Sequence, residues 1–174
     1  PAIIEFCNRM YYGGQLIPMR VPADDAPDPL AIVYAAPGNH ARRPSRGSGF
    51  FSQREIDIVT DLEDMRSIRD GVELEGTDES GDFVVGVVTP FRAQATNLSK
   101  QIRRDLGDGA HPRWLAETAH KFQGRGAGTI ILSTVLNAND RSAAQDFYDA
   151  DALTNVIVSR AKDRFVVVTT HGGV

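Results

Sequence analysis

Three glycines crowd the stretch TAHKFQGRGAGTIILSTV, which runs from Thr118 to Val135. They are Gly124, Gly126 and Gly128, and glycines at this density often let a backbone approach a phosphate group. A P-loop, however, needs Gly-x-x-x-x-Gly-Lys before Ser or Thr, and the chain contains no Gly-Lys dipeptide. A dinucleotide fingerprint needs Gly-x-Gly-x-x-Gly after a strand, whereas this cluster precedes an apolar run. Neither phosphate loop fits, which leaves a flexible turn between a helix and a strand as the simplest interpretation.

Arg160 is the second candidate, within the sequence DALTNVIVSRAK that predicts a helix over residues 151–162. It continues the apolar stripe of Leu153, Val156 and Ile157 at the next helical step. A guanidinium there must reach solvent, pair with a carboxylate, or contact an anion across an interface. Taken alone, the pattern favours a structural ion pair.

Other catalytic arrangements find little support in the residues. No Gly-x-Ser-x-Gly elbow is present, so a serine hydrolase of that type is not expected. The single cysteine, Cys7, is expected to pack on the first helix as a small hydrophobic residue and fits a reducing cytoplasm. No metal site is expected, because the four histidines are scattered without ligand partners. They are His40, His111, His120 and His171.

Length and composition fit one soluble globular domain. The chain has 174 residues, of which 41% are hydrophobic and 24% charged. No apolar stretch approaches the roughly 18 residues that a membrane span needs, so we expect no membrane contact and a cytoplasmic location. Because the chain begins at Pro1 without an initiating Met or a signal peptide, we expect residues 1–174 to be a fragment of a larger protein.

Charge is distributed unevenly along a chain whose formal net charge is −4. Residues 61–82 hold nine acidic and two basic side chains, whereas residues 90–125 hold seven basic and three acidic ones. Two solvated faces would explain this equally well. If the protein contacts a polyanion, the second segment is the one that should do so.

The pattern of elements predicts an α/β fold, with a parallel β-sheet flanked by helices on both faces. Apolar, β-branched runs predict buried strands at LAIVYAA, FVVGVVT, TIILSTV and RFVVVTT. Helices are expected at residues 2–12, 53–68, 91–106 and 151–162. Loops are expected at 35–51 and 71–82, both mobile.

Two of these helices carry specific predictions. Ser52 and Glu55 form a capping-box signature, after which Ile56, Val59, Leu62 or Glu63, and Arg66 should mark one face. The first helix should bury Ile3, Cys7, Met10 and Tyr11 and end at Gly13.

Three segments in order carry a family resemblance. VVTPFRAQ (87–94), TAHKFQGR (118–125) with IILSTV after it, and NVIVSRAKDRFVVV (155–168) resemble motifs IV, V and VI of superfamily 1 helicases. The N-terminal PAIIEFCNRMYYGGQL is similar to the stretch after the Gln-Tyr-Arg motif in the branch related to the nonsense-decay RNA/DNA helicase. The resemblance spans most of the chain, with a loose match over residues 17–82. It implies a single domain, the second (C-terminal) RecA-like domain, of P-loop NTPase type without its own P-loop.

The resemblance implies roles for residues on two sides of this domain. ATP and Mg²⁺ would be bound mainly by an N-terminal RecA-like domain, which carries the P-loop and an acidic pair. Arg160 matches the arginine finger, and Gln123 and Gly124 match residues that join the nucleotide cleft to the nucleic-acid track. The residues that would touch single-stranded nucleic acid, with DNA favoured over RNA, are Thr89, Pro90, Arg92, Thr118 and His120.

One departure from the family pattern leaves an alternative open. Gly126 and Gly128 occupy positions where the family commonly has Glu and Asp. The chain could therefore be a degenerate helicase module that binds nucleic acid or a partner protein without ATPase activity. A nucleotide-handling α/β enzyme of another kind would need a lysine or carboxylate at the cleft, and the sequence offers none.

Overall fold

The computed structural model describes the protein in eight stretches, and every structural statement below concerns these residues. They are residues 2–15, 28–38, 41–45, 49–69, 83–107, 113–122, 125–135 and 151–170.

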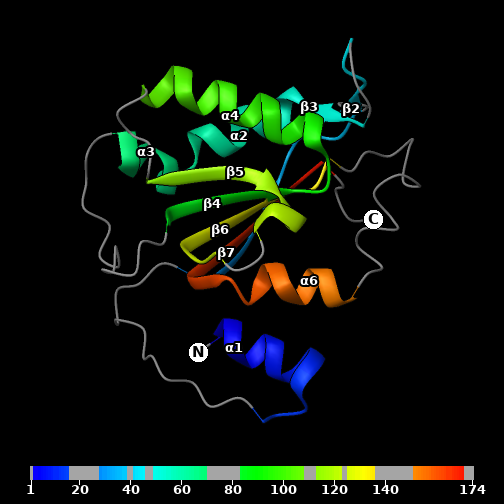
Figure 1. Ribbon diagram of the computed structural model, residues 1–174, viewed down its shortest axis with the longest axis vertical. Helices are drawn as coiled ribbons and strands as arrows, with labels where there is room; N and C mark the ends of the chain where they lie inside the picture. Colours follow the sequence, from blue (N-terminus) through cyan, green and yellow to red (C-terminus); the bar gives the residue numbers. More distant parts are fainter. Residues whose placement is uncertain are drawn as a thin grey trace.

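A five-stranded parallel sheet forms the centre of the fold, with the strand order β1-β7-β6-β4-β5. The strands are β1 (Leu30–Tyr34), β4 (Phe83–Thr89), β5 (Trp114–Thr118), β6 (Ala127–Ser133) and β7 (Ala161–Thr169). Figure 1 shows α2 (Gln53–Asp61), α3 (Glu63–Arg69) and α4 (Arg92–Leu106) on one face, with α1 (Ala2–Cys7) and α6 (Asp151–Val158) on the other. The predicted α/β architecture with helices on both faces is confirmed.

Each face of the sheet has its own apolar core. Ile56, Leu98 and Ile102 from the helices pack with Val85 and Val87 on the α2–α4 face, and all five are fully buried. On the opposite face, Ile3 and Cys7 of α1, Ile157 of α6 and Phe122 cover β4, β6 and β7. Burial also raises the pKa of the Cys7 thiol, in keeping with the small hydrophobic role predicted for it.

The central strands follow the sequence patterns closely, but β5 was not predicted. FVVGVVT is β4 in full, and the amphipathic helix α4 ends where predicted, at Gly107, whose φ is 75°. β5 has the sequence WLAET, whose five residues include a glutamate and lack a β-branched run. Its parallel pairing with β4 stabilises it as a strand, although the strand preference of its own residues is weak.

The helix predicted over residues 53–68 is divided in two at Leu62, whose ψ of 147° is extended. Ile56 and Val59 are buried as predicted, but the break resets the helical register after them. Met65 therefore turns into the core at 2% exposure, whereas Arg66, expected on the buried face, lies at the surface.

The helix predicted over residues 151–162 ends at Val158. Ala161 begins β7 and pairs with Ala127 of β6, so the backbone must leave the helix before it. Arg160 consequently lies in the turn between α6 and β7, and its predicted place on the helix stripe is wrong.

Three further elements depart from expectation. β1, predicted to be buried, is an edge strand whose Ile32 and Tyr34 are 59% and 56% exposed. The first helix changes to a π-helical turn at Asn8–Tyr12, which leaves Met10 exposed. Within the predicted loop 35–51, β2 (Ala41–Arg42) pairs antiparallel with β3 (Phe51–Ser52). Loop 71–82 lies outside the described residues.

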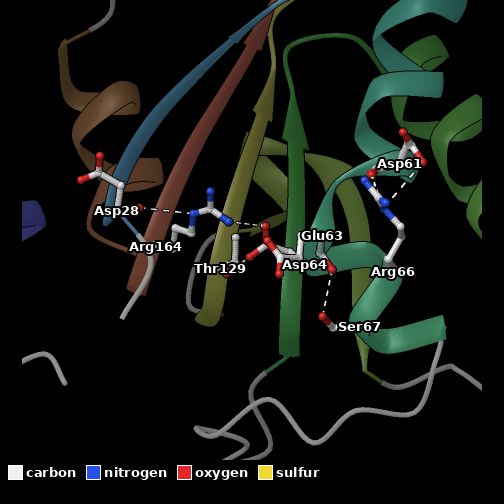
Figure 2. Close-up of polar contacts among 8 residues, drawn as sticks. All are labelled: Asp28, Asp61, Glu63, Asp64, Arg66, Ser67, Thr129 and Arg164. Atoms are coloured by element: carbon white, nitrogen blue, oxygen red, sulfur yellow. Dashed lines mark hydrogen bonds and ion pairs between the residues drawn. The ribbon is translucent and has the colours of Figure 1, made fainter. Parts of the chain in front are cut away.

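An ion pair fastens α3 to the sheet, as Figure 2 shows. Nη1 of Arg164 on β7 lies 2.6 Å from Oδ2 of Asp64 on α3, and Thr129 of β6 donates to Oδ1 of the same carboxylate at 2.9 Å. Arg164 also donates through Nε to the carbonyl oxygen of Asp28 at 3.3 Å. Since the carboxylate of Asp64 is 9% exposed, these contacts compensate for the burial of its charge.

Candidate functional site

The nucleic-acid residues predicted from the sequence meet at the carboxyl edge of the sheet. Thr89 ends β4 and Thr118 ends β5, and the two are direct partners in the parallel register. Pro90 follows Thr89, Arg92 begins α4, and His120 lies in the short 3-10 helix η3 (Ala119–Phe122) that follows β5. In open α/β sheets, ligands bind outside the carboxyl ends of strands, so this grouping has the expected place for a binding site.

These five residues do not all offer groups to a ligand. Thr89 has 0% exposure, and its hydroxyl accepts a hydrogen bond from the backbone N–H of Phe91 at 3.5 Å. Pro90 and Thr118 are partly buried, whereas Arg92 and His120 are exposed. Thr89 therefore shapes the turn, and the other four supply the accessible surface.

Beneath this edge lies a buried polar network that sequence reasoning missed. Gln94 of α4, at 0% exposure, accepts from the N–H of Ser52 at 2.8 Å and donates to Oγ of Ser133 at 2.9 Å. Ser133 in turn donates to Glu55 at 2.7 Å. The network ties α2 and α4 to the end of β6 and thereby fixes the carboxyl edge.

Glu55 is the buried acid of this network. The predicted cap is half right: Oγ of Ser52 accepts from the N–H of Glu55 at 3.3 Å. The Glu55 carboxylate, however, accepts from the N–H of Val135 at 2.9 Å, because Gln94 already occupies the N–H of Ser52. Burial raises the pKa of Glu55 to about 7, against the lowering effect of its bonds to Val135 and Ser133.

Val135 holds an unusual backbone conformation for a β-branched residue, with φ at 54°. Conformations of this kind cost on the order of 1–3 kcal/mol and persist where surrounding contacts impose them. Here the bond from its N–H to Glu55 supplies such a contact. In the sequence, the only sign of this buried network was Glu55, the acidic residue of the predicted capping box.

Arg160 lies at the opposite, amino edge of the sheet. It immediately precedes β7, and its carbonyl oxygen accepts from the N–H of Ala127, the first residue of β6, at 3.2 Å. Gly126 stands beside it and accepts through its carbonyl from the N–H of Phe83 at 3.3 Å. With a rise of about 3.3 Å per residue, β6 separates the two edges by about 20 Å.

The side chain of Arg160 is partly buried, and its Nε atom is buried without an acceptor among the described residues. No carboxylate of the described chain pairs with its guanidinium, so the ion-pair interpretation finds no support in this part of the molecule. Buried donors in proteins are seldom left unsatisfied. The site is thus suited to an acceptor from outside the described residues.

The chain between β5 and β6 passes from one edge to the other. Phe122, 1% exposed, packs in the core that covers the α1 and α6 face, and Arg125 stacks over the ring of Phe83 at 5.6 Å beside the start of β6. Gln123 and Gly124, the predicted cofactor-binding residues, lie outside the described residues.

Gly128 has a crowded environment on β6. A Cβ atom there would lie 3.2 Å from the carbonyl oxygen of Val84 and 3.5 Å from Oδ2 of Asp163 on β7. An acidic side chain at this position would therefore meet both a tight backbone contact and a like charge. The neighbouring strand β7 thus holds the carboxylate of Asp163 next to this position.

No group of three or more His, Cys, Asp or Glu within the described stretches could hold a metal ion. Among the helices of the same stretches, none combines the length and apolar character needed to cross a bilayer. A family model described as an AAA domain matches residues 1–172. That family is of the helicase type, and the match covers both sheet edges.

Proposed function

Because this chain belongs to the AAA domain family and is related to superfamily 1 helicases, we propose that it is the second motor domain of an ATP-dependent helicase or translocase. In this proposal the carboxyl edge binds single-stranded nucleic acid, with DNA favoured. The amino edge faces the N-terminal RecA-like domain, where ATP and Mg²⁺ are mainly bound. Gln123 and Gly124 belong to the connection between the two edges.

The observation that carries the proposal is Nε of Arg160, which is buried without an acceptor among the described residues. A guanidinium held at a domain edge can donate to phosphate oxygens when the partner domain closes on it. ATP would supply the phosphoanhydride bond, and Arg160 would stabilise the charge that develops on the transferred phosphoryl group. Since the chain has no P-loop, we expect the 174 residues alone to hydrolyse no ATP.

The carboxyl edge would hold the nucleic acid without reading its sequence. Arg92 offers an exposed cation, and Thr118 and His120 offer polar groups beside it. Contacts of this kind to phosphate and sugar position a strand but carry no base information.

The test is nucleic-acid-stimulated ATP hydrolysis by the parent protein that joins this chain to a P-loop domain. Arg160→Ala should lower turnover on the order of 10³-fold, the effect expected of an arginine finger. Arg104→Ala removes an exposed arginine of α4 that donates a hydrogen bond to Gln101, and should leave turnover unchanged. Near-normal turnover of the Arg160 variant would refute the finger.

The second candidate is a helicase-like module without ATPase activity, which binds nucleic acid or a partner protein. Gly126 and Gly128 favour it, because both lack the acidic side chains of the family pattern. The same assay separates the two candidates, since a degenerate module gives no stimulated hydrolysis even in the unaltered protein.

A further inference from the structure

An open groove of about 260 Å³ runs between α4 and the edge strand β5. Its floor is made of small side chains: Ala95 of α4 and Ala116 of β5 are 4% and 3% exposed. Ser99 joins the two walls by donating to the carbonyl oxygen of Ala116 at 3.2 Å. Because these side chains are short, helix and strand leave a hollow between them.

The rim of this groove is strongly basic. Arg92, Lys100 and Arg103 line it from α4, and none of the three pairs with a carboxylate in the described stretches. Lys121 of η3 also lines it and is paired with Glu117, the single acidic residue of the lining, at 3.2 Å. The groove therefore presents to a polyanion three cations that have no carboxylate partner among the described residues.

We propose that this groove, the α4–β5 groove, binds the phosphate backbone of a single-stranded nucleic acid that continues past the carboxyl edge. The inference rests on the proposed function and extends its binding site. Arg92 belongs to both surfaces, so the groove begins where the predicted track ends. At 1.5 Å rise per residue, Arg92 and Arg103 stand about 16 Å apart along the helix, which spans several phosphates at about 3.4 Å per stacked nucleotide.

The groove carries none of the marks of base recognition. The described lining contains no aromatic side chain on which a base could stack, and its three α4 cations, Arg92, Lys100 and Arg103, sit on one face of the helix. Such a surface binds by counterion release, which makes affinity depend on salt and not on sequence. With this groove, the domain would bind a longer stretch of single-stranded nucleic acid than the carboxyl edge alone could hold.

The experiment measures binding of fluorescent single-stranded oligonucleotides to the 174-residue chain by anisotropy. One oligonucleotide has about 4 nucleotides and the other about 12, and both lie within the range of about 4–16 nucleotides that single-strand binding domains cover. The test variant is Lys100→Gln with Arg103→Gln. The matched control, Arg104→Gln, removes an exposed arginine of the same helix that does not line the groove. Thermal unfolding by circular dichroism checks that all variants fold.

The double variant should bind the long oligonucleotide about tenfold more weakly, and the slope of log affinity against log salt should fall by about 0.7 for each cation removed. The short oligonucleotide should be unaffected, and the control should behave as the unaltered chain. Equal losses for both lengths, or no loss for either, would overturn the groove proposal alone. If the unaltered chain binds neither oligonucleotide, the proposed function itself fails.

A poly-glutamate peptide of about 12 residues, added as a competitor, tests a protein partner at the same groove. The nucleic-acid assignment predicts weak competition that the double variant does not change. If instead the double variant abolishes peptide binding and leaves oligonucleotide binding intact, the groove binds an acidic protein segment and the assignment is wrong.

Discussion

The buried polar groups of Ser52, Glu55, Gln94 and Ser133 bond to one another at the carboxyl edge of the sheet, whereas at the amino edge Nε of Arg160 is buried without an acceptor in the described stretches. These four groups are satisfied within the domain, although Oγ of Thr170, just after β7, is buried without a partner in the described stretches. The amino edge holds the guanidinium of Arg160, whose Nε needs an acceptor that the described residues do not provide. Under the proposed function, this domain alone would bind the nucleic-acid strand, whereas catalysis would need a second domain.

A substitution at Gly86 tests whether Phe122, in the segment between β5 and β6, must pack closely on the sheet. A Cβ atom at Gly86 would clash with Cζ of Phe122 and lie 2.8 Å from Cδ1 of Ile130. Gly86→Ala should therefore lower the free energy of unfolding by about 3 kcal/mol, at the upper end of overpacking effects. Chemical denaturation measures it, and Phe122→Leu in the same chain should recover part of the loss. An additive double variant would show that Phe122 does not press on this position.

The carboxyl edge makes a prediction about pH. The pKa of Glu55 is raised to about 7 in the folded chain, against 4.5 for an unperturbed glutamate. The folded state therefore binds the proton more tightly, and the stability linked to it is present below pH 4.5 and lost as pH rises through about 7. Across that window the free energy of unfolding should fall by about 1.4 kcal/mol per pH unit from this group.

Glu55→Gln should remove this dependence, because the amide cannot ionise. Denaturation of both proteins at several pH values gives the difference between them, in which other titrating groups cancel. A difference that stays flat from pH 4.5 to 7 would mean that Glu55 ionises in the folded chain as it does in water.

The amino edge is tested at Gly128. Gly128→Asp should destabilise the chain by about 1 kcal/mol through backbone crowding and repulsion from Asp163. Gly128→Ala isolates the crowding, and Asp163→Asn combined with Gly128→Asp should relieve the repulsion. An unchanged melting temperature for Gly128→Asp would show that neither the crowding nor the repulsion acts at this position.

Much of the fold could be predicted because its strongest signals are local. The β-branched runs of β4 and β6 and the amphipathic pattern of α4 each contain their own evidence. The break at Leu62 and the strand β5 depend on packing and pairing partners far away in the chain. Local patterns cannot report such partners.

The candidate site divides in the same way. The family resemblance, and not a local pattern, grouped Thr118 with Arg92, and the structure places both residues at one edge of the sheet. The bonds of Glu55 join residues about 80 positions apart, so its part in the network could not be read from a capping box. Arg160 was misplaced on a helix because the apolar stripe continues up to the point where pairing with β6 begins.

Titration of the 174-residue chain with a single-stranded oligonucleotide tests the division between the edges most directly. Arg92→Ala with Thr118→Val changes the carboxyl edge, and Arg160→Ala changes the amino edge. We expect the first to weaken binding about tenfold or more, from the loss of a charged contact and a neutral hydrogen bond. Arg160→Ala should bind as the unaltered chain does. Equal weakening by the two variants would contradict the account.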